Sequence, residues 1–248
     1  MVIDNDHRPW PVPSRPWVMS QSWEELLFMH WPVPAAALRP HIPSGLAIDT
    51  FEGQAWIAVV PFTMRRTRPY RLPLPFGLGD LPELNVRTYV VRDDRPGVWF
   101  FSLDAGQALA VYAARFWYHL PYFHARMSVL RQADHFAYRS VRIHRHAPAA
   151  AFTATYGPSG DVYHSQPGTL ENWLTERYCL YAVDRRRRLY RGENAHVPWP
   201  LQPAAAEVTV NTLCAPLGLT LPDTAPLLHF ARRLDVVFWA LERVSGSQ

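Results

Sequence analysis

Residues 83–91, ELNVRTYVV, alternate polar and apolar side chains in a pattern that suits a binding site. In an extended strand every second residue points to the same side, so Glu83, Asn85, Arg87 and Tyr89 share one face. Together they offer a carboxyl group, an amide, a guanidinium and a phenol, which supply both hydrogen-bond donors and acceptors. This set predicts a small polar pocket. The alternative is an edge strand whose polar face is solvated.

Three residues elsewhere in the chain carry similar chemistry. Arg115 follows a run of helix-forming residues, where its planar guanidinium suits either a carboxylate ligand or the end of a helix. Glu176 lies in the segment LTERY, where salt-bridged scaffolding is the alternative to a ligand contact. His196 lies among prolines beside Trp199. Its imidazole is a candidate general base or, when protonated, a hydrogen-bond donor to a bound anion. The alternative is a packed histidine bonded to a backbone carbonyl.

The chain contains no lysine, because all 25 of its Lys and Arg residues are arginines. Schiff-base chemistry needs a primary amine, and a Walker-type phosphate loop needs its lysine, so both are excluded. The sequence also lacks G-x-S-x-G, H-E-x-x-H and a G-x-G-x-x-G that follows a strand. His144 and His146 have alternate spacing but no acidic or cysteine partner nearby. We therefore expect neither a metal nor a cofactor.

Composition favours a globular protein made mainly of strands. The chain has 248 residues, 48% of them hydrophobic and 19% charged, with 24 prolines and 12 glycines. Abundant Trp, Tyr and Phe together with Pro turns favour short strands over long helices. We expect an α+β, mainly β fold with an extended arm over residues 1–20 and a single domain over residues 21–248.

Charge and cysteine content indicate in which cellular compartment the protein lies and which classes of partner it binds. The net charge of +4 permits nucleic-acid binding, but the replacement of every lysine by arginine points to a compositional bias instead. Two cysteines, Cys179 and Cys214, indicate no disulfide framework. The N-terminus lacks an apolar signal core, and no apolar run approaches the length of a membrane span. We expect a cytoplasmic protein that binds neither membranes nor nucleic acid.

Short strands should position the candidate residues. Runs of β-branched and aromatic residues bounded by turn residues predict strands over residues 26–33, 53–64, 83–91, 97–103, 123–130, 136–143, 152–156, 178–183, 188–193 and 229–241. A helix capped by Ser22 is the alternative for the first of these runs. Residues 105–118 carry Leu109, Ala113, Phe116 and Trp117 at helical spacing, which predicts a helix. Shorter helical segments are expected over residues 34–39 and 169–175. The four arginines at 185–188 suit a solvated hairpin tip.

Several segments resemble one uncharacterised family, the YqjF-like family or domain of unknown function 2071. They include LLFMHWPV, PELNVRTYV, GVWFFSLDA, ARFWYHLPYFHA, LTERYCLY and AHVPWPL, and the similarity extends over residues 23–239. The resemblance implies an acetoacetate decarboxylase-like fold, a closed or partly open β barrel around a small cavity. It also places Tyr122, in Leu120-Pro121-Tyr122, where the decarboxylase has its Schiff-base lysine, and matches Glu83 to one of the decarboxylase's acids. Amine-dependent decarboxylation is therefore not expected here.

Three functions remain open from the sequence. The first is binding of a small organic acid or similar metabolite in a polar cavity. Its expected residues are Glu83, Asn85, Arg87, Tyr89, Arg115, Tyr122, Glu176 and His196. The second is a lysine-independent lyase or isomerase in the same cavity, with Glu83 or His196 as acid or base and Tyr122 in the amine's position. The third is an interaction module that uses the aromatic arm and the arginine tip. Assembly into a homo-oligomer is left open.

Overall fold

Strands dominate the structure, a computed structural model that describes residues 5–70 and 80–244. The strands are β1 (Met19–Val33), β2 (Ala47–Ile48), β3 (Ala55–Pro69), β4 (Leu81–Arg92), β5 (Arg95–Ala105), β6 (Tyr122–Gln132), β7 (His135–Arg142), β8 (Ala151–Pro158), β9 (Cys179–Val183), β10 (Leu189–Ala195), β11 (Leu201–Asn211), β12 (Leu227–Phe238) and β13 (Glu242–Arg243). The helices are α1 (Ala35–Leu38), α2 (Ala108–Trp117) and α3 (Leu170–Thr175), with 3-10 turns η1 (Arg39–His41) and η2 (Ala215–Leu217).

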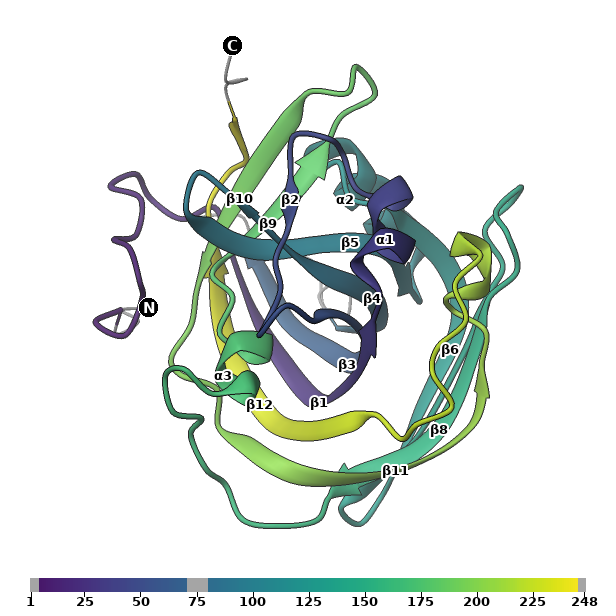
Figure 1. Cartoon of the computed structure of the whole chain (residues 1–248). Coiled ribbons are helices and arrows are strands. Elements are labelled where there is room, and N and C mark those ends of the chain that lie inside the picture. Colours follow the sequence, from purple (N-terminus) through teal and green to yellow (C-terminus); the bar gives the residue numbers. More distant parts are fainter. Residues whose placement is uncertain (1–4, 71–79, 245–248) are drawn as a thin grey trace.

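The described strands form one sheet that curls round on itself (Figure 1). Its order is β13-β10-β9-β5-β6-β7-β8-β11-β12-β1-β3-β4-β2. Additional pairings of β4 with β5 and of β10 with β12 join strands that are distant in this order. Most neighbours are antiparallel, but β5 runs parallel to both β6 and β9. The predicted mainly-β fold with a few short helices is confirmed.

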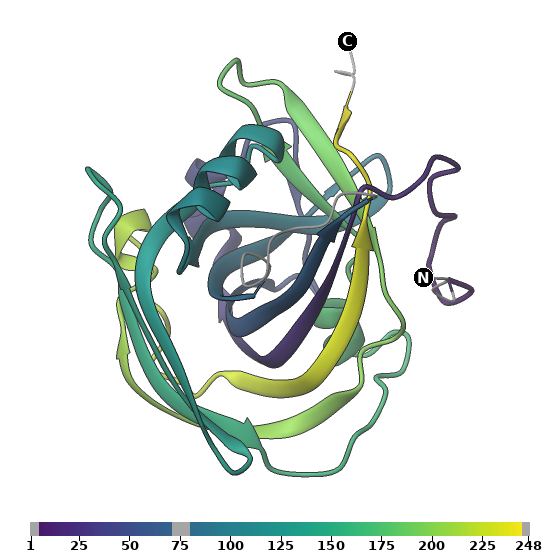
Figure 2. The same ribbon diagram turned by 180° about the vertical axis from the view of Figure 1, so that it is seen from behind.

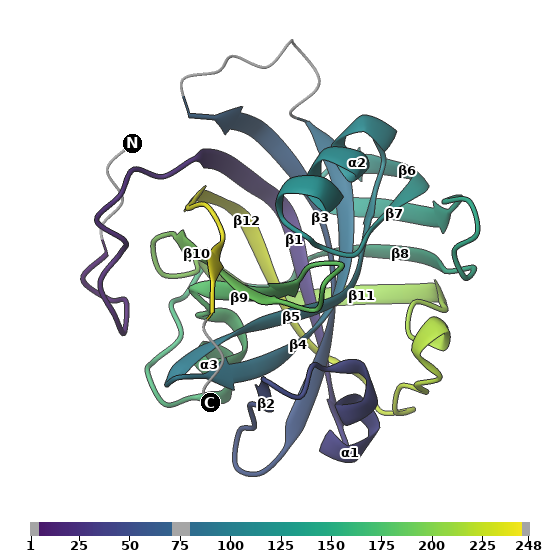
Figure 3. The same cartoon turned by 90° about the horizontal axis from the view of Figure 1, so that it is seen from above.

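Strands β1, β3 and β4 cross the middle of the molecule and separate two packed regions (Figure 3). On one side, Leu84 and Val86 of β4 belong to a core that includes Tyr138 and Phe152 of β7 and β8. On the other side, Phe28 and Val60 belong to a different core around Trp199. Because successive residues of a strand alternate in direction, the same three strands serve both regions.

Most predicted elements are present, usually with longer bounds. The run over residues 26–33 is the second half of β1, so the alternative of a helix capped by Ser22 is wrong. Strand β11 was missed because Pro and three Ala residues, which have weak strand propensity, occupy the first half of its sequence LQPAAAEVTVN. Its pairing with β8, where Ala205 lies opposite Gly157, stabilises it instead. Local pattern gave no signal of this long-range contact.

The predicted N-terminal arm has no helix or strand over residues 5–18, and it lies against the body of the protein. Arg8 Nη2 lies 3.0 Å from Glu193 Oε2, and the Trp10 indole donates to the same oxygen over 2.8 Å. A buried charge is stable only when it is paired, and Arg95 also contacts the Glu193 carboxylate at 3.0 Å. The division between residues 1–20 and 21–248 stays a prediction.

The four arginines at 185–188 lie at the turn between β9 and β10, as expected of a hairpin. The Asp184 carboxylate accepts hydrogen bonds from the backbone amides of Arg186 and Arg188, both over 2.9 Å. Side chains of residues 185–187 are exposed. In the part of the chain that the structure describes, no helix is long and apolar enough to cross a membrane. The cytoplasmic location stays a prediction.

Candidate functional site

The polar row of β4, which comprises Glu83, Asn85, Arg87 and Tyr89, is buried. The exposed fractions of these residues are 3%, 5%, 8% and 0%, respectively. The alternative of a solvated edge strand is therefore wrong, because β4 lies between β3 and β5 and both of its faces are covered. Buried polar groups need partners, so the contacts of each member decide what the row can bind.

Strands β1 and β3 bring a histidine and a phenylalanine beside Arg87. His30 pairs with Ala58, and Ala58 pairs with Arg87, so residues 30 and 87 share one face of the sheet. The Arg87 guanidinium carbon lies 5.2 Å from the centre of the Phe28 ring. That ring in turn meets Trp199 edge-on, with 4.9 Å between the ring centres. Arg87 therefore lies in a largely aromatic environment.

His30 is held by the last tyrosine of the row. Its Nε2 lies 2.7 Å from the Tyr89 hydroxyl oxygen, and that hydroxyl donates to the Leu174 carbonyl of α3 over 2.9 Å. Since the hydroxyl proton is used on Leu174, the histidine nitrogen is the donor in the first bond. Burial and the charge of Arg87 hold the His30 pKa well below its usual value, so the ring is neutral. Its Nδ1 is then a buried acceptor, with no hydrogen-bond partner in the described structure.

Glu83 of β4 and Tyr122 of β6 contact each other. The Tyr122 hydroxyl donates to Glu83 Oε2 over 2.8 Å. Burial raises the pKa of the Glu83 carboxyl to about 8, although the bond from Tyr122 opposes this shift. Burial and the neighbouring Glu83 also raise the Tyr122 pKa well above its usual value. At neutral pH both groups are therefore uncharged.

Arg87 carries a positive charge that no described carboxylate balances. Residue 87 takes part in none of the ion pairs of the described residues, although other buried arginines do, such as Arg142 with Asp104 at 2.8 Å. Its Nε and Nη2 are buried and have no hydrogen-bond partner within residues 5–70 and 80–244. Unpaired buried donors on a cation are costly, which makes this guanidinium the most unusual group of the row.

Arg115 lies outside this cluster. It is exposed on α2, and its Nη1 donates to the Tyr122 carbonyl over 2.6 Å. Its guanidinium carbon lies 5.7 Å from the centre of the Phe123 ring. Arg115 therefore binds the backbone of Tyr122 from the surface and is not part of the buried cluster around Arg87.

Glu176 and His196 both contact Trp199. Glu176 accepts hydrogen bonds from the Tyr178 hydroxyl and, over 2.8 Å, from the Trp199 backbone amide. The His196 ring stacks on Tyr178 with 4.8 Å between centres, and its Nδ1 lies 2.7 Å from the Val197 carbonyl oxygen. Burial lowers the pKa of His196. The Trp199 ring also contacts the His196 ring, with 5.4 Å between their centres. The bond of His196 to a backbone carbonyl is the packed alternative given for this residue, and Glu176 makes hydrogen bonds in place of the expected salt bridges.

Sequence reasoning missed two histidines, His30 and His229. His30 interrupts the apolar run LLFMHWPV on the side of Phe28, and a polar residue in a buried strand was the available signal. His229 of β12 lies opposite Phe28, and its ring centre is 6.3 Å from that of His30. Its Nδ1 is also buried without a described partner. No three His, Cys, Asp or Glu residues in the described ranges are grouped so that they could hold a metal.

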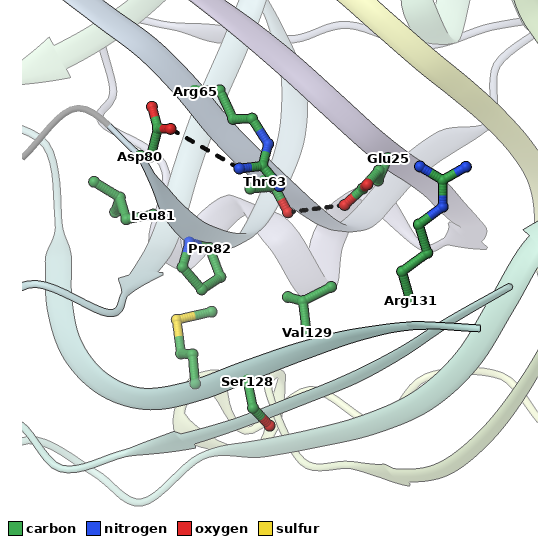
Figure 4. A pocket seen from close by; sticks show the side chains of 10 residues that line it. Glu25, Thr63, Arg65, Asp80, Leu81, Pro82, Ser128, Val129 and Arg131 are labelled. Carbon is green, nitrogen blue, oxygen red and sulfur yellow. Dashed lines mark hydrogen bonds and ion pairs between the residues drawn. The ribbon is translucent and has the colours of Figure 1, made fainter. Parts of the chain in front are cut away.

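A separate pocket of about 410 Å³ opens on the other side of β3 and β4 (Figure 4). It is lined by Glu25, Thr63, Arg65, Asp80, Leu81, Pro82, Met127, Ser128, Val129 and Arg131. The Thr63 hydroxyl donates to Glu25 Oε2 over 3.3 Å, and Arg65 lies 3.9 Å from Asp80. None of the residues predicted from the sequence lines this pocket. Its arginines have acidic neighbours, unlike Arg87.

The fold is similar to that of acetoacetate decarboxylase-like proteins. MppR, an enduracididine biosynthesis enzyme solved with the condensation product of pyruvate and imidazole 4-carboxaldehyde, superposes with a TM-score of 0.65 at 13% identity. The match covers 93% of this chain and 90% of that chain. Acetoacetate decarboxylase from Legionella pneumophila gives a TM-score of 0.61 at 13% identity, over 97% and 94% of the two chains. At such identity the likeness shows the fold alone.

The chain belongs to the DUF2071 family, described as "Uncharacterized conserved protein", which it matches over residues 20–235. One relative, "Uncharacterized protein YqjF" from Bacillus subtilis (strain 168), is 45% identical over 234 residues. That match covers 94% of this chain and 96% of the relative. The resemblance seen in the sequence motifs is therefore confirmed, both for the family and for the fold.

Proposed function

We propose that this protein binds a small organic acid whose carboxylate is held by Arg87. The observation that carries the proposal is the pair of buried, unpartnered nitrogens Nε and Nη2 of that residue. These two nitrogens form one edge of the planar guanidinium, and their hydrogens point in the same direction. A carboxylate accepts both of them in parallel, which is the strongest geometry available to an arginine.

The protonation of the neighbours favours a monoanion. Glu83 is protonated at neutral pH because burial raises its pKa to about 8, and His30 is neutral because burial lowers its pKa. Arg87 then leaves the row with a single positive charge. One carboxylate balances this charge, whereas a neutral ligand leaves it uncompensated in a site of low dielectric constant.

The remaining unpartnered atoms favour a second polar group on the ligand. Asn85 Oδ1 and His30 Nδ1 are buried acceptors without described partners. Residues two apart on a strand are separated by roughly 6.5–7 Å, so Asn85 lies within reach of a short acid bound at Arg87. A hydroxyl or amino group on the ligand supplies the donor that these acceptors lack. Short hydroxy and oxo acids are therefore the first compounds to test.

Pyruvate is a suitable probe because MppR has also been solved with pyruvate. Any binding here must differ chemically, since this chain has no lysine to form a Schiff base. Tyr122 and Glu83 lie beside each other as a neutral pair, and neither replaces an amine. Support for the proposal comes from Arg87 and its surroundings, with the MppR ligand as an analogy.

Calorimetric titration of pyruvate and lactate tests the proposal directly. The variant Arg87→Met keeps the length of the side chain and removes the charge, and we expect it to weaken binding by at least about 10- to 100-fold. The control is Arg139→Met, an exposed arginine on β7. Equal affinity in the Arg87→Met and Arg139→Met proteins would contradict the proposal. Arg87→Met should also fold normally, because it removes an unpaired buried charge.

Catalysis is a second candidate, favoured by the protonated carboxyl of Glu83. An acid with a pKa of about 8 can donate to a ligand carbonyl oxygen at neutral pH, as a lyase or isomerase requires. His196 is less suited, because Trp199 lies between it and Phe28. Exchange of the pyruvate methyl protons in D2O, followed by NMR with wild type and Glu83→Gln, tests this. Exchange that persists unchanged in Glu83→Gln removes Glu83 from the reaction.

A further inference from the structure

Helix α2 carries a row of large apolar side chains on its outer side. Leu109, Tyr112, Phe116 and Trp117 are 74%, 63%, 74% and 69% exposed. Their spacing places them along one side of the helix. Figure 2 shows α2 on the outside of the curled sheet. Scattered apolar side chains are ordinary on a surface, but a contiguous row of this size marks an interaction surface.

The helix itself is well anchored, so the exposed row is not the result of a loose segment. Val111 is fully buried in the core around Trp199, and Ala110 packs against the same core. On its other flank, Arg115 donates to the Tyr122 carbonyl over 2.6 Å. The inner side of α2 is thus occupied, and the outer row is displayed from a fixed position.

The charge of the helix argues against a membrane as its partner. Helices that lie on anionic membranes carry several Lys or Arg residues on the polar side. The sequence of α2 is ALAVYAARFW, in which Arg115 is the single charged residue. That guanidinium is bonded to Tyr122 and lies over the ring of Phe123. An apolar row on a helix whose single charged side chain already has partners fits a protein surface of the same kind.

We propose that α2 packs against α2 of a second copy of this chain about a two-fold axis. Two antiparallel helices place Leu109 of one copy beside Phe116 and Trp117 of the other, and each contact then occurs twice. Large side chains bury about 150–250 Å² each, so the four of the row supply roughly 500–700 Å² per copy. This approaches the about 800 Å² per partner of a stable interface, and the flanking residues add to it.

The proposed interface uses none of the residues of the proposed binding site, so it does not depend on the proposed function.

Ala113 lies near the midpoint of the row, so the two copies of this residue are expected close to the axis. Cys179 and Cys214 are buried, which leaves a cysteine introduced at position 113 as the accessible thiol of the described chain. Two such thiols near a two-fold axis are within reach of a disulfide or a short crosslinker.

Sedimentation analysis of the full chain from about 1 to 100 µM tests the proposal. Wild type should be dimeric, and Phe116→Ser with Trp117→Ser should raise the dissociation constant by about 100-fold or more. The control is Val208→Ser with Val210→Ser, two exposed apolar residues on β11, 37% and 39% exposed. This control should remain dimeric, and circular dichroism should show the same strand content in all three proteins.

Two further measurements make the result decisive. Mild oxidation should convert Ala113→Cys, but not wild type, into a covalent dimer. A wild type that is monomeric up to about 100 µM, or a dimer that survives both serine substitutions, would overturn the proposal. Binding of a monomeric wild type to vesicles of phosphatidylcholine and phosphatidylglycerol, lost in the double serine variant, would also overturn it and identify a membrane surface instead.

Discussion

The two sides of β4 differ in how completely their groups are satisfied. On one side, Leu84 and Val86 are buried in a continuous apolar core, and the Tyr138 hydroxyl near them donates to the Glu83 carbonyl over 2.8 Å. On the other side, Arg87 and Asn85 are also buried but leave polar atoms without described partners. One strand therefore contributes a packed core and an incomplete polar site, separated by the thickness of a single sheet.

The difference between the two sides of β4 indicates which residues contribute mainly to folding stability and which to ligand binding. Apolar groups contribute to folding in proportion to the area that they bury. Unpaired buried donors contribute nothing to folding and cost free energy until a ligand arrives. Substitutions on the two sides of β4 should therefore change different measured quantities.

The largest expected effect is on the packed side. Leu84→Ala should lower the free energy of unfolding by about 2–5 kcal/mol, because it removes buried methyl groups and leaves a cavity. Its matched control is Asn85→Ala on the next residue, which removes an amide whose oxygen has no described partner. We expect the control to cost less than about 1 kcal/mol in denaturant unfolding. Equal losses for the two variants would break the comparison between the sides.

The next effect concerns pH. Burial raises the Glu83 pKa from 4.5 to about 8, so the folded protein retains a proton that the unfolded chain releases near pH 4.5. This contribution to stability is fully present below about pH 4.5 and is lost as the pH rises through 8. Glu83→Gln cannot ionise, so wild type should lose a few kcal/mol relative to it between pH 5 and pH 8.5. Parallel pH profiles for the two proteins would show that Glu83 titrates normally.

A smaller effect is expected from Tyr122. Tyr122→Phe removes the hydroxyl that donates to Glu83 and should cost about 1 kcal/mol of stability. That hydrogen bond lowers the Glu83 pKa, so its loss should move the titration of the carboxyl further upwards. NMR titration of a ¹³C-labelled glutamate side chain follows this shift. A downward shift would mean that Tyr122 does not stabilise the ionised carboxyl.

Strand β4 and helix α2 show how far a sequence pattern reaches. Alternation in ELNVRTYVV correctly grouped Glu83, Asn85, Arg87 and Tyr89 on one face, because direction along a strand is a local property. The helical spacing of Leu109 and Phe116 likewise predicted α2. Periodicity does not say what covers a face, however, and the row of α2 is exposed although it has the composition of a buried one.

The two histidines near the polar row, His30 and His229, could not be predicted from local sequence pattern. The pairing of β1, β3 and β4 brings His30 to the side of Arg87, and the pairing of β12 with β1 brings His229 to His30. Three further candidates from the sequence have structural partners: Arg115, Glu176 and His196. Residue type identified these side chains as capable of binding, but the contacts that occupy them depend on strands far away in the chain.

The sequence by itself determined the mainly-β class, the family, the absence of a reactive amine and the polar row of β4. These follow from composition, motifs and the alternation of neighbouring residues, which are independent of long-range contacts. Only the tertiary structure decided that the row is buried, that Glu83 meets Tyr122 and is protonated, and that Arg87 lacks a described counter-ion. The physical reason is that burial and charge pairing depend on which distant strands pack together, and desolvation then sets the protonation of each group.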